Sequence, residues 1–325
     1  MYGNTMRLFL NKLDTGLSKE AQGALATVIR RKVRERGISP RVIPFEVISP
    51  GDIRIQRDID KDIIYFLGEK EADSYSVVLT LEGHPGVVEP RGTRFRVDFY
   101  QFATPKIRKH EINLLSYTYS FEKWLEENVV YDIEEAYDTK FITLALRAAE
   151  LSGQIINNQT ANAKFTLTDF IELQKMLTKT KKASDANIIV LNKTTFLEFL
   201  GQGTSVFGDI LQKEIVINGY KYQTLLDTAF VVTENNVVCP PGIVFAFAKP
   251  QYLGVVPVLH DIKFFIKKEG PEVEWYTWSI LGMNIANANG VAVLIYGSQG
   301  WNIVDNKITY TYGGVNYTEP PYPEV

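Results

Sequence analysis

The sequence predicts an α+β fold in which one long helix packs against extended strands. The helix is indicated by apolar residues that recur every three or four positions between Phe121 and Leu151, with no interrupting proline. The strands are indicated by alternating polar and apolar residues in Arg94–Tyr100 and again in Val273–Leu281. Because an amphipathic helix and an alternating strand each bury one apolar face, the two patterns together predict a shared core.

The composition is that of an ordinary globular chain. Of the 325 residues, 45% are hydrophobic and 22% are charged, and the formal net charge is -3. This balance predicts no attraction of the whole chain to polyanions. The single cysteine, Cys239, excludes an intrachain disulfide and therefore a disulfide-stapled secreted domain. No signal peptide is evident, and no apolar run approaches the roughly 18 residues of a membrane helix, so we expect no membrane partner.

Residues 1–50 are predicted to form an N-terminal arm. They hold nine Lys and Arg against four acidic residues, whereas residues 261–325 hold four Lys against seven acidic residues. The two ends are therefore expected to attract each other or their counterparts on neighbouring copies. Ser18 is the expected N-cap of a helix that runs to about Arg36 and stops at Gly37. Its basic face is either solvated or lies on a partner or on nucleic acid.

Residues 51–116 are predicted to form strands and a long two-stranded excursion. Residues 51–75 alternate over one or two strands, and a β-rich strand follows at Ser76–Leu81. After a turn-rich tip the chain returns in the strand Arg94–Tyr100. Because an isolated hairpin is not stable by itself, this excursion is expected to pack on its own body or on a neighbour.

The region after the long helix is predicted to be compact and α+β. A helix is expected at residues 166–182, capped by Thr166 or Thr168. A buried strand at Asn187–Leu191 and a short helix at Lys193–Leu200 follow.

Three late strands, Ile262–Lys267, Val273–Leu281 and Val291–Tyr296, are expected to close the sheet that packs on the long helix. Trp275 and Trp278 alternate with polar residues in the second of these strands, and both are expected to pack on the helix. The tail that follows, from Trp301, is predicted to form a small β meander.

The sequence is poor in catalytic patterns, so we expect no catalytic residue, no metal site and no cofactor. The three histidines have no metal-pair spacing, no phosphate-binding loop occurs, and the acidic run that starts at Asp58 lacks the glycine of a calcium loop. The acidic outward face of the long helix, Glu122–Asp138, is expected to be solvated or to face a partner. One alternative is that Asp227, in a segment that resembles the aspartic-protease signature, pairs with a second copy as an aspartic-type hydrolase.

The order of these elements resembles that of a tailed-phage major capsid protein of the Hong Kong 97 type. Three segments carry the resemblance: PKIRKHEINLLSY, which leads into the long helix; INGYKYQTLLDTAFVVTEN; and DIKFFIKKEG followed by WYTWSILGMNIANANGVAVLIYG. Together they cover roughly residues 50–297, and their order is more specific than any one of them.

The resemblance implies a division into an arm, an extended loop, a peripheral domain and an axial domain. The implied parts are the N-terminal arm (1–50), the first part of the peripheral domain (51–75), the extended loop (76–116), the peripheral domain with its spine helix (117–155), the axial domain (156–257), the closing strands of the peripheral domain (258–297) and a C-terminal β-rich tail (298–325).

The function implied by the resemblance is that of a capsid subunit and not of an enzyme. Such subunits assemble in the host cytoplasm into hexamers and pentamers of an icosahedral shell, the virion capsid, which encloses double-stranded DNA. Scaffolding, portal and decoration proteins are the further partners implied. No long charged helical region precedes the arm, so a separate scaffolding protein or prior cleavage is expected, and no Lys–Asn cross-link is expected.

An encapsulin-like nanocompartment shell is the alternative. The candidates for subunit contacts or a DNA-facing surface are Arg30, Arg31, Arg34, Arg91, Arg94, Lys106, Arg108, Glu269 and Glu272.

Overall fold

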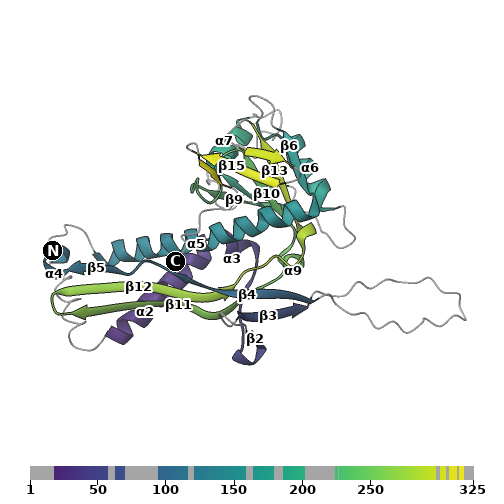
Figure 1. Cartoon of the computed structure of the whole chain (residues 1–325). Coiled ribbons are helices and arrows are strands. Elements are labelled where there is room, and N and C mark those ends of the chain that lie inside the picture. Colours follow the sequence, from purple (N-terminus) through teal and green to yellow (C-terminus); the bar gives the residue numbers. More distant parts are fainter. Residues whose placement is uncertain are drawn as a thin grey trace, which may run out of the picture.

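The fold combines a seven-stranded sheet, a six-stranded sheet and a three-stranded meander with one long helix, α5 (Phe121–Ser152), that packs against both larger sheets (Figure 1). This arrangement confirms the α+β class. The computed structural model describes residues 18–57, 63–69, 94–115, 121–158, 164–178, 186–201, 224–225, 227–297, 301–304, 307–312 and 315–317. The strand expected at Ser76–Leu81 and the tip of the extended excursion lie outside these residues.

Helix α5 forms where its periodicity predicts it, within one residue of the expected end. Its stripe of apolar side chains, which includes Ile133, Tyr137 and Phe141, is buried in the core that joins the two large sheets. The helix ends before Gly153, whose φ of 66° belongs to the left-handed region that favours glycine.

The seven-stranded sheet has the order β1-β11-β12-β4-β3-β2, and β5 also pairs with β12. β11 and β12 form its longest hairpin, which turns at Gly270 with a φ of 59°. Its strands are β1 (Phe45–Val47), β2 (Ile53–Gln56), β3 (Ile63–Glu69), β4 (Arg94–Ala103), β5 (Ile107–His110), β11 (Val256–Glu269) and β12 (Glu272–Gly282).

Side chains alternate between the two faces of this sheet, and the alternation corrects one expectation. Trp275 is 1% exposed and belongs to the core with α5. Trp278 is only partly buried, and its ring lies under the ammonium of Lys263. Residues an odd number apart in a strand point to opposite faces, so the prediction that both tryptophans pack on the helix is wrong for Trp278.

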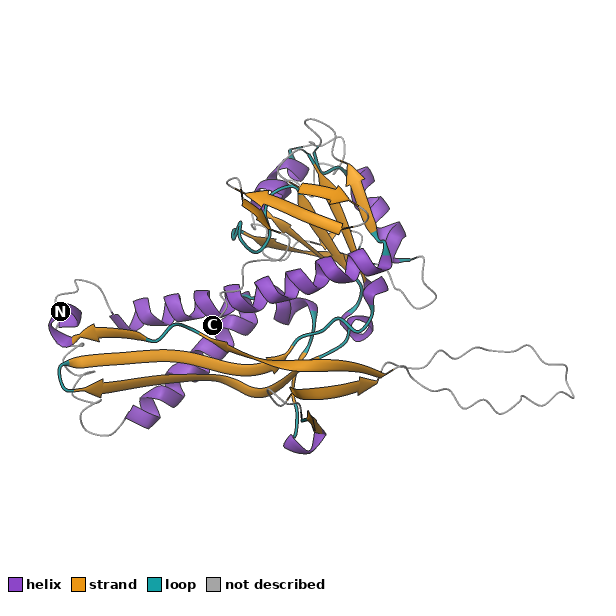
Figure 2. Cartoon of the chain, in the orientation of Figure 1, coloured by secondary structure: helices purple, strands orange, loops and turns teal. Residues whose placement is uncertain are grey.

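The six-stranded sheet has the order β6-β13-β10-β7-β9-β8. Helices α6 (Leu167–Leu177) and α7 (Lys193–Leu200) pack on one of its faces and α5 packs on the other (Figure 2). Its strands are β6 (Ile155–Asn158), β7 (Ile188–Asn192), β8 (Thr224–Leu225), β9 (Thr228–Thr233), β10 (Ile243–Phe247) and β13 (Val291–Tyr296).

Strand β13 corrects a second expectation, because it was predicted to close the sheet formed by the preceding two strands. It pairs instead with β10 and, in parallel, with β6. Val291, Val293 and Ile295 belong to the core with α5, whereas Leu294 and Tyr296 belong to the core under α6 and α7. An unbroken apolar run is typical of a strand covered on both faces, and the six-stranded sheet is the one so covered.

Shorter elements complete the chain. The N-cap of α6 is Thr166, which forms a capping box with Asp169. The remaining elements are α2 (Ser18–Arg36), α3 (Ile38–Val42), η1 (Pro50–Asp52), α4 (Glu111–Leu115), α9 (Pro250–Leu253), η2 (Ala288–Gly290), β14 (Trp301–Val304), β15 (Lys307–Tyr312) and β16 (Val315–Tyr317).

Candidate assembly surfaces

Residues 18–47, here called the strap, lie along the outer edge of β11. The strap begins with α2, where Gln22 Nε2 donates to the carbonyl of Ile266 at 2.8 Å and Arg30 Nε donates to the carbonyl of Ile262 at 3.0 Å. It ends with β1, which pairs in parallel with residues 256–258 of the same edge. An open sheet edge is a template for further strands, so the strap occupies a surface that would otherwise attract another chain.

Two of the predicted contact residues hold the strap to its own subunit. Arg34 NH2 lies 2.8 Å from Asp261 Oδ2, and Arg30 NH1 lies 3.9 Å from the same oxygen. The attraction expected between the basic and acidic ends of the chain is therefore present within one copy at Asp261. Arg31 differs, because its side chain is 69% exposed and its ion-pair partner is Glu35, one turn further along α2, at 4.0 Å.

A buried carboxylate anchors the middle of the strap. Asp138 of α5 is 3% exposed, and its two oxygens accept hydrogen bonds of 2.8 Å from the backbone N–H groups of Ile38 and Ser39. Burial raises the pKa of Asp138 to about 6, although these hydrogen bonds favour the charged form. Burial and the charge of Asp138 raise the pKa of Glu134 to about 7. The acidic face of the helix was expected to be solvated or to face a partner, and for Asp138 this is wrong.

Four other predicted contact residues meet where β5, β11 and β12 run together. Lys106 pairs with Glu274, and Arg108 reaches Glu274 at 3.1 Å and Glu272 at 3.4 Å. Glu269 is 3.3 Å from a lysine of its own strand. We call this group the tip cluster; it consists of Lys106, Arg108, Lys267, Glu269, Glu272 and Glu274.

The remaining two candidates lie elsewhere. Arg94 begins β4, opposite Glu69 of β3, and is exposed. Arg91 lies outside the described residues.

The face of the seven-stranded sheet that points away from α5 carries an aromatic band that sequence reasoning missed. Phe265 and Tyr276 are cross-strand neighbours with ring centroids 5.0 Å apart. Trp278 follows on the same face, with Lys263 Nζ 4.9 Å from its ring centre. These three rings are partly exposed and stand outside the apolar core on the other face of the sheet. The sequence contained a signal for this band, because residues 273–281 have aromatic side chains at both odd and even positions. Odd and even positions of a strand point to opposite faces, so aromatic side chains had to lie on both faces of the sheet.

Strands β2 and β3 extend the apolar character of the surface. Ile55 and Ile64 face each other across this pair of strands and are 62% and 38% exposed. β3 also pairs with β4, so β2 is the edge strand of the seven-stranded sheet. An exposed aliphatic pair at a sheet edge is suited to contact with another molecule.

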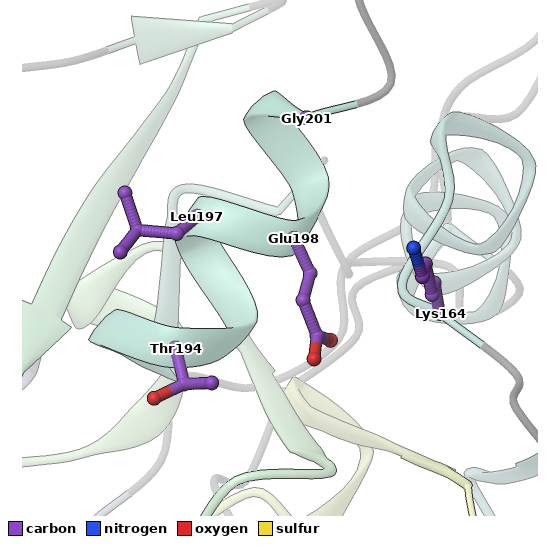
Figure 3. A pocket seen from close by; sticks show the side chains of 5 residues that line it. All are labelled: Lys164, Thr194, Leu197, Glu198 and Gly201. Carbon is purple, nitrogen blue, oxygen red and sulfur yellow. The ribbon is translucent and has the colours of Figure 1, made fainter.

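A small pocket of about 540 Å³ lies beside α7, lined by Lys164, Thr194, Leu197, Glu198 and Gly201 (Figure 3). Glu198 Oε2 is 3.0 Å from the hydroxyl of Tyr296, which donates to it or to Thr195. Within the described part of the chain, no group of three or more His, Cys, Asp or Glu side chains is arranged to hold a metal ion.

Asp227 lies in the tight turn between β8 and β9. Leu225 and Thr228 pair across this turn, and Asp227 is exposed with a φ of 61°. Asp is one of the few residues besides glycine that adopts this conformation readily, so the turn accounts for the Asp-Thr sequence without a catalytic role.

Comparison with solved structures identifies the fold. No family model and no curated protein matches the sequence. Among solved structures, the capsid of cyanophage P-SCSP1u aligns with a TM-score of 0.53 at 10% identity, over 78% of this chain and 86% of that chain. The capsid of cyanophage Pam1 aligns with a TM-score of 0.52 at 9% identity, over 79% and 89%. The chain has a phage-capsid fold.

A virus-like particle from Pyrococcus furiosus has a similar fold, with a TM-score of 0.50 at 16% identity over 85% of this chain and 99% of that chain. At these identities the likeness establishes the phage-capsid fold, and it confirms at that level the resemblance to tailed-phage capsid proteins. Among the described residues, no helix is long and apolar enough to cross a membrane.

Proposed function

We propose that this chain is a major capsid protein, which assembles into hexamers and pentamers of an icosahedral shell around double-stranded DNA. The observation that supports this most directly is the phage-capsid fold, shared over more than three quarters of the chain with two cyanophage capsids. In this proposal the protein acts in the virion, after assembly in the host cytoplasm with scaffolding, portal and decoration proteins.

The surfaces of the chain fit a structural subunit better than an enzyme. The aromatic band continues into the tip cluster on one face of β11 and β12, and together with the exposed pair Ile55 and Ile64 it gives areas for contacts between copies. The candidate catalytic carboxylate, Asp227, stands in an exposed turn. Aspartic catalysis depends on two carboxylates that share a proton, whereas the φ of 61° at Asp227 is explained by its place in a turn.

The proposal also assigns a different role in the shell to each of the predicted domains. The parts assigned to the arm, the extended loop, the peripheral domain and the axial domain would each contribute different contacts in a shell. The boundaries remain a proposal, and the position of β13 in the six-stranded sheet argues that residues 291–296 belong with the axial part.

The test is direct imaging of the purified protein by electron microscopy, combined with size-exclusion chromatography. We expect closed shells, or rings of subunits when no scaffolding protein is present. A species that remains monomeric at all salt concentrations, with and without a candidate scaffolding protein, would contradict the proposal.

Charge reversal separates contacts between copies from contacts within a copy. Arg31→Glu and Glu272→Lys alter side chains that are at least 47% exposed. Both are expected to leave the monomer folded and to reduce shell yield at least tenfold, because like charges would then meet at the interface. Arg34→Glu is the comparison variant, because its ion-pair partner Asp261 is only 26% exposed, whereas the partners of Arg31 and Glu272 in the same subunit are 67% and 59% exposed. Exposed ion pairs contribute little to stability, so only Arg34→Glu is expected to destabilise the monomer itself. Normal shell yields from both exposed variants would refute their assignment to contacts.

An encapsulin-like shell is the second candidate, favoured by the similarity to the virus-like particle from Pyrococcus furiosus. The content of shells recovered from the native source distinguishes the two. Nuclease-protected double-stranded DNA supports the capsid, whereas a packaged enzyme without nucleic acid supports the nanocompartment.

A further inference from the structure

The aromatic band of Phe265, Tyr276 and Trp278 presents ring faces on the side of the seven-stranded sheet that points away from α5. Phe265 and Tyr276 form a cross-strand pair with ring centroids 5.0 Å apart, and Trp278 is the next ring on that face of β12. The side chains of this hairpin that pack with α2 and α5, among them Phe264 and Trp275, point to the other face. Tyr and Trp are enriched at binding surfaces, so the band is a candidate site for another segment.

Lys263 gives the band a positive charge. It is exposed, and its ammonium lies 4.9 Å from the centre of the Trp278 ring. His260 meets the same ring in a T-shaped arrangement, with centroids 5.8 Å apart. Arg108 of the neighbouring tip cluster is already paired with Glu274. Lys263 is therefore the side chain of the band that can pair with a carboxylate on an incoming segment.

Residues 318–325 carry the complementary chemistry in their sequence. They read TEPPYPEV, with three prolines, one tyrosine, two glutamates and no basic residue, and they lie outside the described part of the chain. Proline has no N–H to donate to a sheet, so segments of this composition bind through side-chain contacts rather than as an added strand. Proline-rich segments dock on aromatic-lined surfaces, because their backbone is already restricted before binding. The composition therefore suits a face of aromatic rings and not a sheet edge.

We propose that residues 318–325 of one copy bind the aromatic band of a second copy. The prolines and Tyr322 supply apolar and aromatic faces for the three rings, and Glu319 and Glu324 supply carboxylates for Lys263. The inference rests on the proposed function and deepens it, because it names the segment of a neighbouring copy that the band receives.

The position of the meander favours a second copy over the same chain. Tyr317 of β16 pairs with β15, and β15 contacts α5. Figure 1 shows β15 beside the six-stranded sheet, on the other side of α5 from the seven-stranded sheet. Within one copy, α5 and the whole seven-stranded sheet therefore separate Tyr317 from the band. A segment of eight residues spans at most roughly 28 Å, so it would have to pass around the sheet to reach its own band.

Photo-cross-linking of the full-length chain tests this contact. The photoreactive residue p-benzoylphenylalanine replaces Tyr322, and the irradiated chain is digested and analysed by mass spectrometry. Equal amounts of unlabelled and isotopically labelled chain are mixed before irradiation, so that a cross-link between copies joins peptides of different label. We expect cross-links of mixed label that join residues 318–325 to Phe265, Tyr276 or Trp278.

Two variants of the band and two matched controls show whether the band itself is the site. Trp278→Ala should lower the cross-link yield roughly tenfold, because aromatic anchors dominate binding surfaces. Lys263→Glu, at an exposed position, should lower it roughly fivefold, because it places like charges together. Tyr131→Ala, at a ring that is 55% exposed on α5, and Lys175→Glu, at an exposed position of α6, should leave the yield unchanged.

The prolines provide a separate test on the side of the segment. Replacing Pro320, Pro321 and Pro323 by alanine keeps both glutamates and position 322 but frees the backbone. The cross-link yield should fall roughly threefold or more, because a less restricted segment loses more entropy on binding.

Several outcomes would overturn the inference. They are cross-links confined to one chain, cross-links to other surfaces, and yields that neither Trp278→Ala nor Lys263→Glu lowers. Shells that form without these cross-links would also overturn it and would leave the proposed function intact. Cross-links of mixed label in a chain that never forms shells would support the contact and contradict the proposed function.

Discussion

At the scale of single residues, the core around α5 depends on polar groups whose partners lie far away in the sequence. Tyr137 is 2% exposed, and its hydroxyl donates to the side chain of Ser279 in β12 at 2.6 Å. Burial raises the pKa of Tyr137, so the hydroxyl remains a proton donor over the whole physiological range. This hydrogen bond ties the helix to the centre of the seven-stranded sheet.

A double-mutant cycle measures that bond. Tyr137→Phe and Ser279→Ala are each expected to lower the free energy of unfolding by about 1–3 kcal/mol, because each leaves a buried hydroxyl without its partner. The double variant should lose less than the sum of the two, by about 0.5–1.5 kcal/mol. Urea denaturation followed by circular dichroism gives the three values. Strict additivity would show that the two hydroxyls do not stabilise each other.

The residues that sequence reasoning placed wrongly share a physical cause. Asp138 follows the acidic pattern of an exposed helix face, and its burial arises only because the strap folds over it. Trp278 is an odd number of residues from Trp275, so strand alternation alone excludes that both face the helix, but which of the two is buried is decided by how the strand packs on α5. Both outcomes depend on contacts between distant segments, which local periodicity does not contain.

At the scale of elements, the sequence predicted best where one pattern was long or had clear ends. The helix α5 needed only its periodicity, and α7 was bounded by the N-cap Asn192 and by Gly201. The segment Val291–Tyr296 was recognised as a strand, but its sheet was not. An apolar run can form a strand of any sheet that is covered on both faces. After β12 ends at Gly282, the chain leaves the seven-stranded sheet and β13 joins the six-stranded sheet, and the apolar run itself does not specify this change of sheet.

Two glycines predict opposite responses to the same substitution. Gly153 ends α5 with a φ of 66°, whereas Gly23 lies inside α2, and at both positions an added Cβ meets no other atom within 4 Å. Gly153→Ala is expected to lower the free energy of unfolding by about 1–2 kcal/mol, because alanine is strained in the left-handed region. Gly23→Ala is expected to raise it by about 0.5–1 kcal/mol through helix propensity. Thermal denaturation of the two variants tests the pair, and equal signs would contradict it.

At the scale of the whole molecule, one core joins the two large sheets. Phe245 and Phe247 of the six-stranded sheet belong to the same buried cluster as Phe264 and Trp275 of the seven-stranded sheet, with α5 between them. Phe141 of α5 contributes to this joint, with its ring centroid 5.3 Å from that of Phe247.

This shared core predicts that the two sheets unfold as one cooperative unit. Trp275 reports on the seven-stranded sheet by fluorescence once Trp124, Trp278 and Trp301 are replaced by phenylalanine. Cys239, fully buried beside the six-stranded sheet, reports by reaction with a thiol reagent. Burial raises the pKa of the Cys239 thiol to about 12, so the native chain should react only after it opens. The two probes are expected to give the same denaturant midpoint.

Truncation at the joint sharpens this test. Phe141→Ala removes a ring that is 1% exposed and should lower the free energy of unfolding by about 3–5 kcal/mol. Because α5 supports both sheets, the fluorescence midpoint and the thiol-reaction midpoint should fall together. Leu151→Ala, at a position of α5 that is 84% exposed, is the matched control and should move neither midpoint. If Phe141→Ala shifted the thiol reaction alone, the six-stranded sheet would be an independent folding unit and α5 would not couple it to the rest.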